Sequence, residues 1–142
     1  MFPPYIFEGN DPIWKQSEQE VDLGGCAKGY IVDRLVEWFQ SLGTTTYGIV
    51  DGGGDMRFWS NGDKCWTIAV ADPYDVTRPI YTFHAYNGAV ATSNRLYRSW
   101  KIGNEQYHHI LDGQTGRPVI TNVIQATVRT KCAFEAEVLA KM

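Results

Sequence analysis

The stretch Val21–Leu42, which reads VDLGGCAKGYIVDRLVEWFQSL, decides how this chain is expected to fold. A short extended segment passes through Gly24-Gly25 into an apolar-periodic run, which predicts an amphipathic helix over 27–42. Gly43 follows at the position of a left-handed C-cap, so the helix has a predicted end as well as a period. The apolar residues at three- and four-residue steps, which predict the buried face, are Ala27, Ile31, Leu35, Trp38, Phe39 and Leu42.

The start of this helix is a candidate anion site. Gly24 and Gly25 remove side-chain bulk where backbone N–H groups point outward from a helix N-terminus, which favours a phosphate. The partial positive charge there stabilises an exposed anion by about 0.3–1 kcal/mol. A carboxylate at Asp22 repels phosphate unless it accepts hydrogen bonds from the ligand or attracts a cation. Spacing alone favours a simpler alternative, a tight turn with Asp22 as an N-terminal cap.

Composition predicts one folded globular domain. The chain has 142 residues, of which 44% are apolar and 13% aromatic, enough to bury a core. A net charge of −3 gives no footprint for nucleic acid. Three widely spaced cysteines indicate neither a disulfide framework nor a zinc site.

The two ends of the sequence predict a piece of a longer protein. The first residues, MFPPYIFEGNDPIW, contain no basic region followed by a long apolar segment, so no secretion signal or membrane span is visible. The chain enters a strand almost at once, and Met142 lies inside an unfinished helical pattern. We therefore expect residues 1–142 to form a single domain, the C-terminal portion of a larger protein.

The middle of the chain is expected to be rich in strands. A hairpin is predicted over 5–15, and further strands are predicted at 44–50, 56–59, 66–71, 80–85, 89–92 and 123–129. Asn61-Gly62 and Asn87-Gly88 predict hairpin turns within 56–71 and 80–92. Thr130 is the predicted N-cap of a last helix that begins near Cys132, in which Glu137 and Lys141 are spaced as a helical ion pair.

Three further segments carry polar side chains suited to a site. The loop DGGGD (51–55) allows close approach to its backbone, and the arginines of SNRLYR (93–98) suit a phosphate or a carboxylate, although both segments are also ordinary surface loops. In HHILDGQTGRP (108–118), only one of two adjacent histidines can face a given site. A histidine near a carboxylate is suited to accept a proton at neutral pH, whereas no third ligand supports zinc.

These motifs together resemble the ApbE family of flavin transferases. The resemblance is carried, in chain order, by DLGGCAKGY (22–30), DGGGD (51–55), AVATS (89–93) and HHILDGQTGRPV (108–119). It implies an FAD:protein FMN transferase, a bacterial enzyme that binds FAD, needs Mg²⁺, and moves FMN onto a threonine or serine hydroxyl with release of AMP. The implied acceptor is a protein of a membrane redox complex. The implied location is the cell envelope, and the cytoplasm remains an alternative because no leader is visible.

The resemblance also implies roles for individual residues. It implies His109 as the base, with Asp112 supporting its turn, and the Gly25 carbonyl and Glu137 as metal ligands. Leu111 is implied to contact the flavin through its backbone. The positions implied to bind the flavin nucleotide are Asp22, Gly24, Gly25, Lys28, Thr92, Ser93 and Leu111.

The sequence departs from the family pattern at several of these positions. Asn94 replaces a usual glycine and Gly113 a common proline, while Glu137 and Lys141 stand where the family has an aspartate and a threonine that help bind the metal. Mg²⁺ enforces its geometry tightly, and an ammonium cannot ligate it, so Lys141 is expected either to weaken the metal site or to replace its charge. The earlier half of a typical member, which contributes flavin contacts, is also absent from the resemblance.

We therefore predict an α+β fold in which an antiparallel β-sheet packs against two main helices, with the site between the Gly24-Gly25 helix start and the turn at 109–115. The leading hypothesis is a Mg²⁺-dependent FAD:protein FMN transferase. The alternative is a flavin or nucleotide-binding module without transferase activity.

Overall fold

The structure is a computed structural model that describes residues 5–8, 11–14 and 22–142. Two helices and ten strands are present in this part of the chain. In chain order they are β1 (Tyr5–Glu8), β2 (Asp11–Trp14), α1 (Ala27–Ser41), β3 (Tyr47–Asp51), β4 (Asp55–Ser60), β5 (Trp66–Ala71), β6 (Pro79–Ala85), β7 (Gly88–Asn94), β8 (Ser99–Ile102), β9 (Glu105–His108), β10 (Gln125–Thr130) and α2 (Ala133–Leu139).

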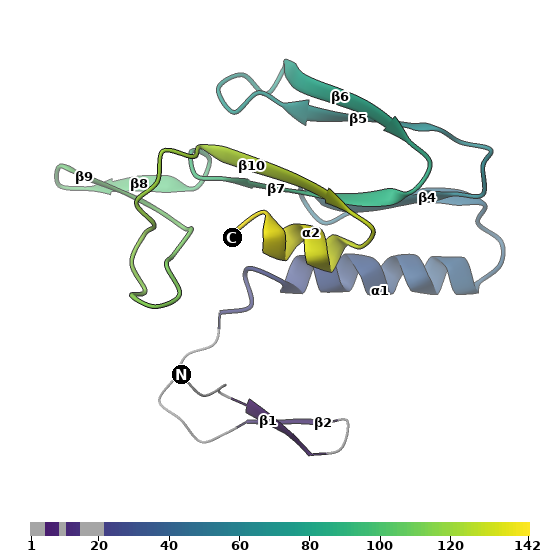
Figure 1. The fold of residues 1–142 in the computed structure, drawn as a ribbon, viewed down its shortest axis with the longest axis horizontal. Coiled ribbons are helices and arrows are strands. Elements are labelled where there is room, and N and C mark those ends of the chain that lie inside the picture. Colours follow the sequence, from purple (N-terminus) through teal and green to yellow (C-terminus); the bar gives the residue numbers. More distant parts are fainter. Residues whose placement is uncertain (1–4, 9–10, 15–21) are drawn as a thin grey trace.

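The centre of the fold is an antiparallel sheet of four strands in the order β10-β7-β4-β3. Both helices lie on one side of this sheet, and the β5-β6 hairpin lies on the other (Figure 1). Alternation along β7 supplies both interfaces, because Val90 packs towards the hairpin while Ala89 and Ala91 pack towards the helices. The predicted α+β fold, with an antiparallel sheet against two helices, is therefore confirmed.

Two predicted hairpins are wrong in their pairing. The strands on either side of Asn61-Gly62 do not pair with each other, since β4 lies between β3 and β7 while β5 pairs with β6. The same holds for Asn87-Gly88, because β7 pairs with β4 and β10. Both turns carry the chain between the sheet and the hairpin layer, and Asn87 ties them together by accepting a hydrogen bond from the Ser60 amide at 3.1 Å. The predicted N-terminal hairpin is present as β1-β2, although Lys15 lies outside the described residues.

Helix α1 has the predicted ends but not the predicted face. Gly43 has φ of +67° and its amide donates to the Gln40 carbonyl, so the C-cap is confirmed. The buried face consists of Gly29, Val32, Asp33 and Val36. Most of the larger apolar residues predicted to be buried are exposed instead: Ile31, Leu35, Trp38 and Leu42. Apolar residues cover more than one side of this helix, and the side with the smaller side chains is the one that allows close packing.

Helix α1 approaches helix α2 closely at Gly29. A Cβ at this glycine would lie 2.5 Å from the Ala133 carbonyl oxygen and 2.8 Å from Phe134 Cα, so only glycine fits. Each helix also supplies a carboxylate that accepts hydrogen bonds from the first turn of the other helix. Asp33 of α1 accepts hydrogen bonds from the Ala133 and Phe134 amides, both at 2.9 Å, at the start of α2. Glu137 of α2 accepts a hydrogen bond from the Gly29 amide at 2.7 Å, in the first turn of α1.

Asp33 therefore caps α2, and the predicted N-cap role of Thr130 is wrong. The N-cap position is Cys132, and Thr130 donates its hydroxyl to the Cys132 carbonyl at 2.6 Å instead of accepting from the helix. A carboxylate supplied by the neighbouring helix satisfies the amides that a local side chain was expected to satisfy. Asp33 is itself held by Arg57 of β4, whose Nη1 lies 3.0 Å from Asp33 Oδ1.

No helix in the described part of the chain has the length and apolar character needed to span a membrane.

Candidate functional site

The segment before α1 forms a tight turn in which some amides are already used. Asp22 Oδ1 accepts a hydrogen bond from the Gly24 amide at 2.7 Å, and the Ala27 amide donates to the Leu23 carbonyl at 2.9 Å. The predicted tight turn is thus confirmed, whereas the predicted role of Asp22 as the N-terminal cap is wrong, because the N-cap position of α1 is Cys26 and no side chain caps it. Among the described residues, none accepts a hydrogen bond from the amides of Gly25 and Lys28. These two N–H groups are what remains at the helix start for an anion.

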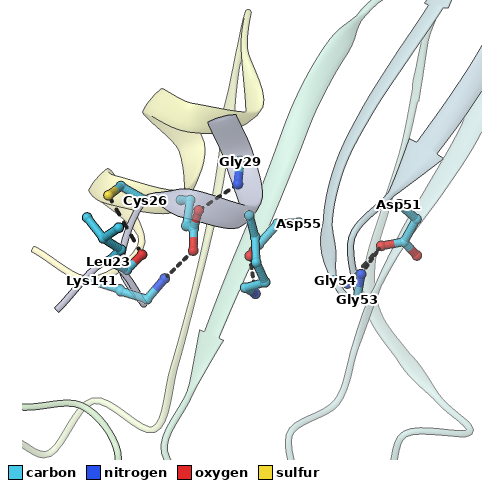
Figure 2. A network of polar contacts seen from close by, with 10 residues as sticks. Leu23, Cys26, Gly29, Asp51, Gly53, Gly54, Asp55 and Lys141 are labelled. Carbon is cyan, nitrogen blue, oxygen red and sulfur yellow. Dashed lines mark hydrogen bonds and ion pairs between the residues drawn. The ribbon is translucent and has the colours of Figure 1, made fainter. Parts of the chain in front are cut away.

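Glu137 occupies the first turn of α1 from the side of α2. Its side chain is fully buried, and Oε2 accepts a hydrogen bond from the Gly29 amide, one of the first-turn N–H groups that have no partner within the helix. Its other oxygen, Oε1, lies 3.3 Å from the ammonium of Lys141. The Lys141 side chain runs beside Gly25, where a Cβ would lie 3.6 Å from Lys141 Cδ. Lys141 therefore reaches from the end of α2 to the Gly-Gly turn before α1 (Figure 2).

A second ion pair lies next to this network. Lys28 of α1 pairs with Asp55 of β4, whose carboxylate is almost completely buried, while the Lys28 side chain is 42% exposed. Asp55 closes the DGGGD loop, and in the same view Asp51 of that loop accepts hydrogen bonds from the amides of Gly53 and Gly54 (Figure 2). Asp51 thus stabilises the loop, and Asp55 fixes Lys28, the lysine predicted to bind a nucleotide.

The two histidines of the 108–118 segment have different environments, as alternation along the strand predicted. His108 is buried, its Nε2–H donates to the Val119 carbonyl at 3.1 Å, and its Nδ1 accepts from the Ile110 amide at 3.3 Å. Both ring nitrogens of His108 are therefore used inside the fold. His109 is half-buried, and its Nδ1 lies 3.3 Å from the Arg98 carbonyl oxygen. Because a carbonyl can only accept, the Nδ1–H donates and the lone pair is on Nε2.

His109 is held in the neutral form that a base requires. Burial lowers its pKa below the ordinary value of 6.5, the hydrogen bond to the Arg98 carbonyl opposes this, and the positive charges of Arg98 and Lys141 lower it further. Figure 1 shows the beginning of α1, the end of α2 and the loop after β9, which carries His109, at one end of the molecule.

Asp112 organises the turn that follows His109. Its Oδ1 accepts hydrogen bonds from the Gln114 and Thr115 amides, each at 2.8 Å, and these bonds lower the pKa of its carboxyl group. Leu111 forms an antiparallel bridge with Pro118. The flanking hydrogen bonds are made by Asp112 and Ile110, so the backbone groups of Leu111 point away from Pro118, as a backbone contact to a ligand would need. Asp112 itself acts by holding the conformation of this turn and is therefore a positioning residue.

The structure separates Thr92 from Ser93. Both lie on β7, and successive side chains alternate between its two faces. Ser93 is buried on the face of Ala91, which packs against α2, and so belongs to the helix side where Glu137 and Lys141 lie. Thr92 is on the opposite face, where its hydroxyl lies 2.9 Å from that of Thr127 on β10. The fold brings Ser93 towards the predicted site and directs the side chain of Thr92 away from it.

The residues present do not fit a Mg²⁺ ion at this place. Mg²⁺ requires near-octahedral oxygen ligands at about 2.0–2.1 Å. Of the implied ligands, Glu137 already uses one oxygen for the Gly29 amide and the other for Lys141, and an ammonium cannot ligate a cation. Nowhere in the described part of the chain do three His, Cys, Asp or Glu side chains gather in a way that could hold a metal. The Mg²⁺ dependence implied by the sequence resemblance stays a prediction that this arrangement does not support.

Taken together, the fold and the site define an α+β domain that collects two lysines, a buried glutamate and a histidine with a fixed tautomer at one end of its helix layer. The sequence profile of the ApbE family matches residues 6–142, and the chain belongs to this family.

Solved structures of family members have the same fold. The ApbE protein of Thermotoga maritima is 33% identical and superposes with a TM-score of 0.84, over 97% of this chain and 45% of that protein. The flavin transferase ApbE of Vibrio cholerae is 31% identical with a TM-score of 0.73, over 97% of this chain and 44% of that protein. Among curated relatives, the FAD:protein FMN transferase of Vibrio cholerae is 34% identical over 136 residues, which are 94% of this chain and 40% of the relative. The chain thus spans less than half the length of the relatives it matches.

Sequence reasoning missed Asp33 and Arg57, and it singled out the loop that contains Asp55 without the ion-pair partner of that residue. Asp33 and Arg57 each lie among apolar residues, where a charged residue reads as a surface position. Their partners lie far away in sequence, on α2 for Asp33 and on α1 for Asp55, so no local pattern indicated them. A charged residue at a buried step of a helix, as Asp33 is among Gly29, Val32 and Val36, was the one available signal.

Proposed function

We propose that this chain forms the nucleotide and base side of an FAD:protein FMN transferase, which moves FMN from FAD to a threonine or serine hydroxyl of an acceptor protein. The observation that carries the proposal is His109, a neutral imidazole with Nε2 as its free acceptor, on the segment that lies at the same end of the molecule as the start of α1. Family membership supports the same activity, since relatives of this chain are named FAD:protein FMN transferases.

In the proposed reaction the acceptor hydroxyl oxygen attacks the phosphorus on the FMN side of the FAD diphosphate. An O–P bond forms, the bond between that phosphorus and the bridging oxygen breaks, and AMP leaves with the electron pair. The hydroxyl proton passes to Nε2 of His109, while Nδ1–H stays on the Arg98 carbonyl and keeps the ring oriented. The amides of Gly25 and Lys28 would bind phosphate oxygens. The proposed acceptor is a protein of a membrane redox complex, and the proposed location is the bacterial cell envelope.

The second candidate is a flavin-binding module that transfers slowly or not at all. It is favoured by one observation, the salt bridge of Glu137 with Lys141 at the place where the resemblance implies a metal. Binding needs only amides and a positive charge near the diphosphate, whereas transfer also needs stabilisation of the charge that develops as AMP leaves.

Mass spectrometry separates the two candidates. The purified protein is incubated with FAD, MgCl₂ and a threonine-containing acceptor peptide, and the peptide is examined for added FMN. We expect the wild-type protein to form the product, and His109→Ala to reduce its rate by about 10²–10⁴-fold, the usual contribution of a general base, while FAD binding is kept. The control is His84→Ala, an exposed histidine on β6 in the opposite layer, which should leave the rate unchanged. FAD binding without any product would favour the second candidate, and equal rates in wild type and His109→Ala would remove His109 from its role.

A further inference from the structure

The end of α2 places a positive charge of the chain itself beside the helix start. Lys141 Nζ lies 3.3 Å from Glu137 Oε1, and its side chain runs along Gly25. Glu137 is completely buried, whereas the Lys141 side chain is 25% exposed. The ammonium is therefore held by a buried carboxylate, while about a quarter of the Lys141 side chain is accessible from the surface.

At this site the positive charge beside the carboxylate of Glu137 is the ammonium of Lys141, a group of the protein itself. A fully buried carboxylate requires a positive partner, and here Lys141 supplies it. An ammonium has three N–H donors, of which one is directed at Glu137, so the others are left for a ligand on the open side. The adjacent amides of Gly25 and Lys28 add neutral donors. Together they suit an anion that carries several oxygens.

The neighbouring lysine differs from Lys141 in position. Both ammonium groups pair with a buried carboxylate, Lys28 with Asp55 and Lys141 with Glu137, and both side chains are partly exposed. Lys141 is the one whose side chain runs along Gly25 at the helix start, so its remaining N–H donors lie beside the amides there.

We propose that Lys141 takes the place of a divalent cation in this chain, so that its site binds the diphosphate of a flavin nucleotide without a metal. The inference rests on the proposed function for the identity of the nucleotide. It follows from the misfit described above: both oxygens of Glu137 are in use, and the residue that reaches the remaining space carries a positive charge.

The first test compares FAD binding by the wild-type protein in EDTA and in MgCl₂, followed by quenching of flavin fluorescence. We expect equal affinity in both solutions. Binding that appears only with MgCl₂ would overturn the inference and leave the proposed function standing. No binding in either solution would overturn the proposed function itself, so the two failures are distinguishable.

The second test removes the charge. Lys141→Met should weaken FAD binding in EDTA by about 10- to 100-fold, the usual effect of one hydrogen bond to a charged group. Lys131→Met, which removes an exposed lysine just before α2, should leave the affinity unchanged. Because Lys141→Met leaves a buried carboxylate unpaired, the double variant Glu137→Gln/Lys141→Met is measured as well, since it keeps an acceptor for the Gly29 amide. Wild-type affinity in a folded double variant would overturn the inference.

A third variant adds back a ligand for a metal. Lys141→Thr replaces the ammonium with a hydroxyl, and we expect its FAD binding to depend on MgCl₂ and to be lost in EDTA. Binding by Lys141→Thr that is as strong in EDTA as that of the wild-type protein would show that the ammonium contributes nothing, and would also overturn the inference.

Discussion

The substitution Gly29→Ala tests the contact that holds the two helices together, because two physical effects predict opposite signs. Alanine is the better helix former by about 0.8–1.0 kcal/mol, so local propensity alone predicts a more stable protein. Packing predicts the reverse. The new Cβ would lie 2.5 Å from the Ala133 carbonyl oxygen and 2.7 Å from its carbon, and both atoms belong to the backbone of α2. The helices must therefore move apart.

The size of the effect follows from the contacts that such a movement disturbs. Overpacking costs about 1–3 kcal/mol. Separation also stretches the hydrogen bonds of Gly29 to Glu137 and of Ala133 to Asp33, each worth about 1.5–3 kcal/mol when the acceptor is charged, and we expect them to be weakened rather than lost. After the propensity gain is subtracted, Gly29→Ala should lower the free energy of unfolding by about 2–4 kcal/mol.

The assay is urea unfolding of the purified protein, followed by circular dichroism. Gly113→Ala is the matched control, because a Cβ at Gly113 meets no atom within 4 Å, and this variant should stay within about 0.5 kcal/mol of wild type. A Gly29→Ala protein as stable as wild type, or more stable, would refute both the close approach of the helices and the exchange of carboxylates between them.

Two further predictions concern the face of α1 and the protonation of His109. Val36→Ala should lower the free energy of unfolding by about 2 kcal/mol, because the Val36 side chain is completely buried. Leu35→Ala should lower it by less than about 1 kcal/mol, because Leu35 is 40% exposed. The opposite order in urea unfolding would support the buried face predicted from sequence. The pKa of His109 is lowered in the folded protein. Between that lowered value and 6.5, the unfolded chain therefore binds more protons than the folded protein does. The contribution of His109 to the free energy of unfolding rises with pH across this window and is complete above it. In unfolding experiments at a series of pH values, His109→Asn should flatten that rise. In the wild-type protein, the transfer rate should fall only when the pH drops below the lowered pKa of His109. A stability profile that His109→Asn leaves unaltered would contradict this assignment.

Much of the fold could be predicted because it depends on local signals. The period and the C-cap glycine set the ends of α1, and the run at 66–71 matches β5 residue for residue. Strand pairing could not be predicted in the same way. The Asn-Gly turns at 61–62 and 87–88 have the sequence of hairpin turns, but Phe58 and Val90 pack with Ile68 and Ala85 across two layers, and this burial decides where each strand goes. The buried face of α1 was missed for a related reason, since two sides of the helix are apolar and only tertiary packing selects one.

The site was predictable where a residue acts through its own neighbours in sequence. The different environments of His108 and His109 follow from strand alternation, and the turn role of Asp112, which the resemblance implied, depends on amides two and three residues further on. The roles of Asp33 and Asp55 depend on partners in other elements, as does the placement of Thr92 on the far face of β7. A position-by-position comparison carries residue identities but not the face of a strand or the partner of a charge.

The charge balance of the site bears on what it can do. Lys141 with Glu137 is neutral overall, and so is Lys28 with Asp55, whereas a divalent cation beside one carboxylate would leave one positive charge. Charge–charge attraction scales directly with that net charge, so a diphosphate is attracted here less strongly than by a metal, through the N–H donors of Lys141 and the amides of the helix start. Hydrogen bonds of this kind bind the ground state well, but a bare positive charge is what stabilises the extra charge on departing AMP. We therefore expect the replacement of a metal by Lys141 to lower the rate of transfer more than the affinity for FAD.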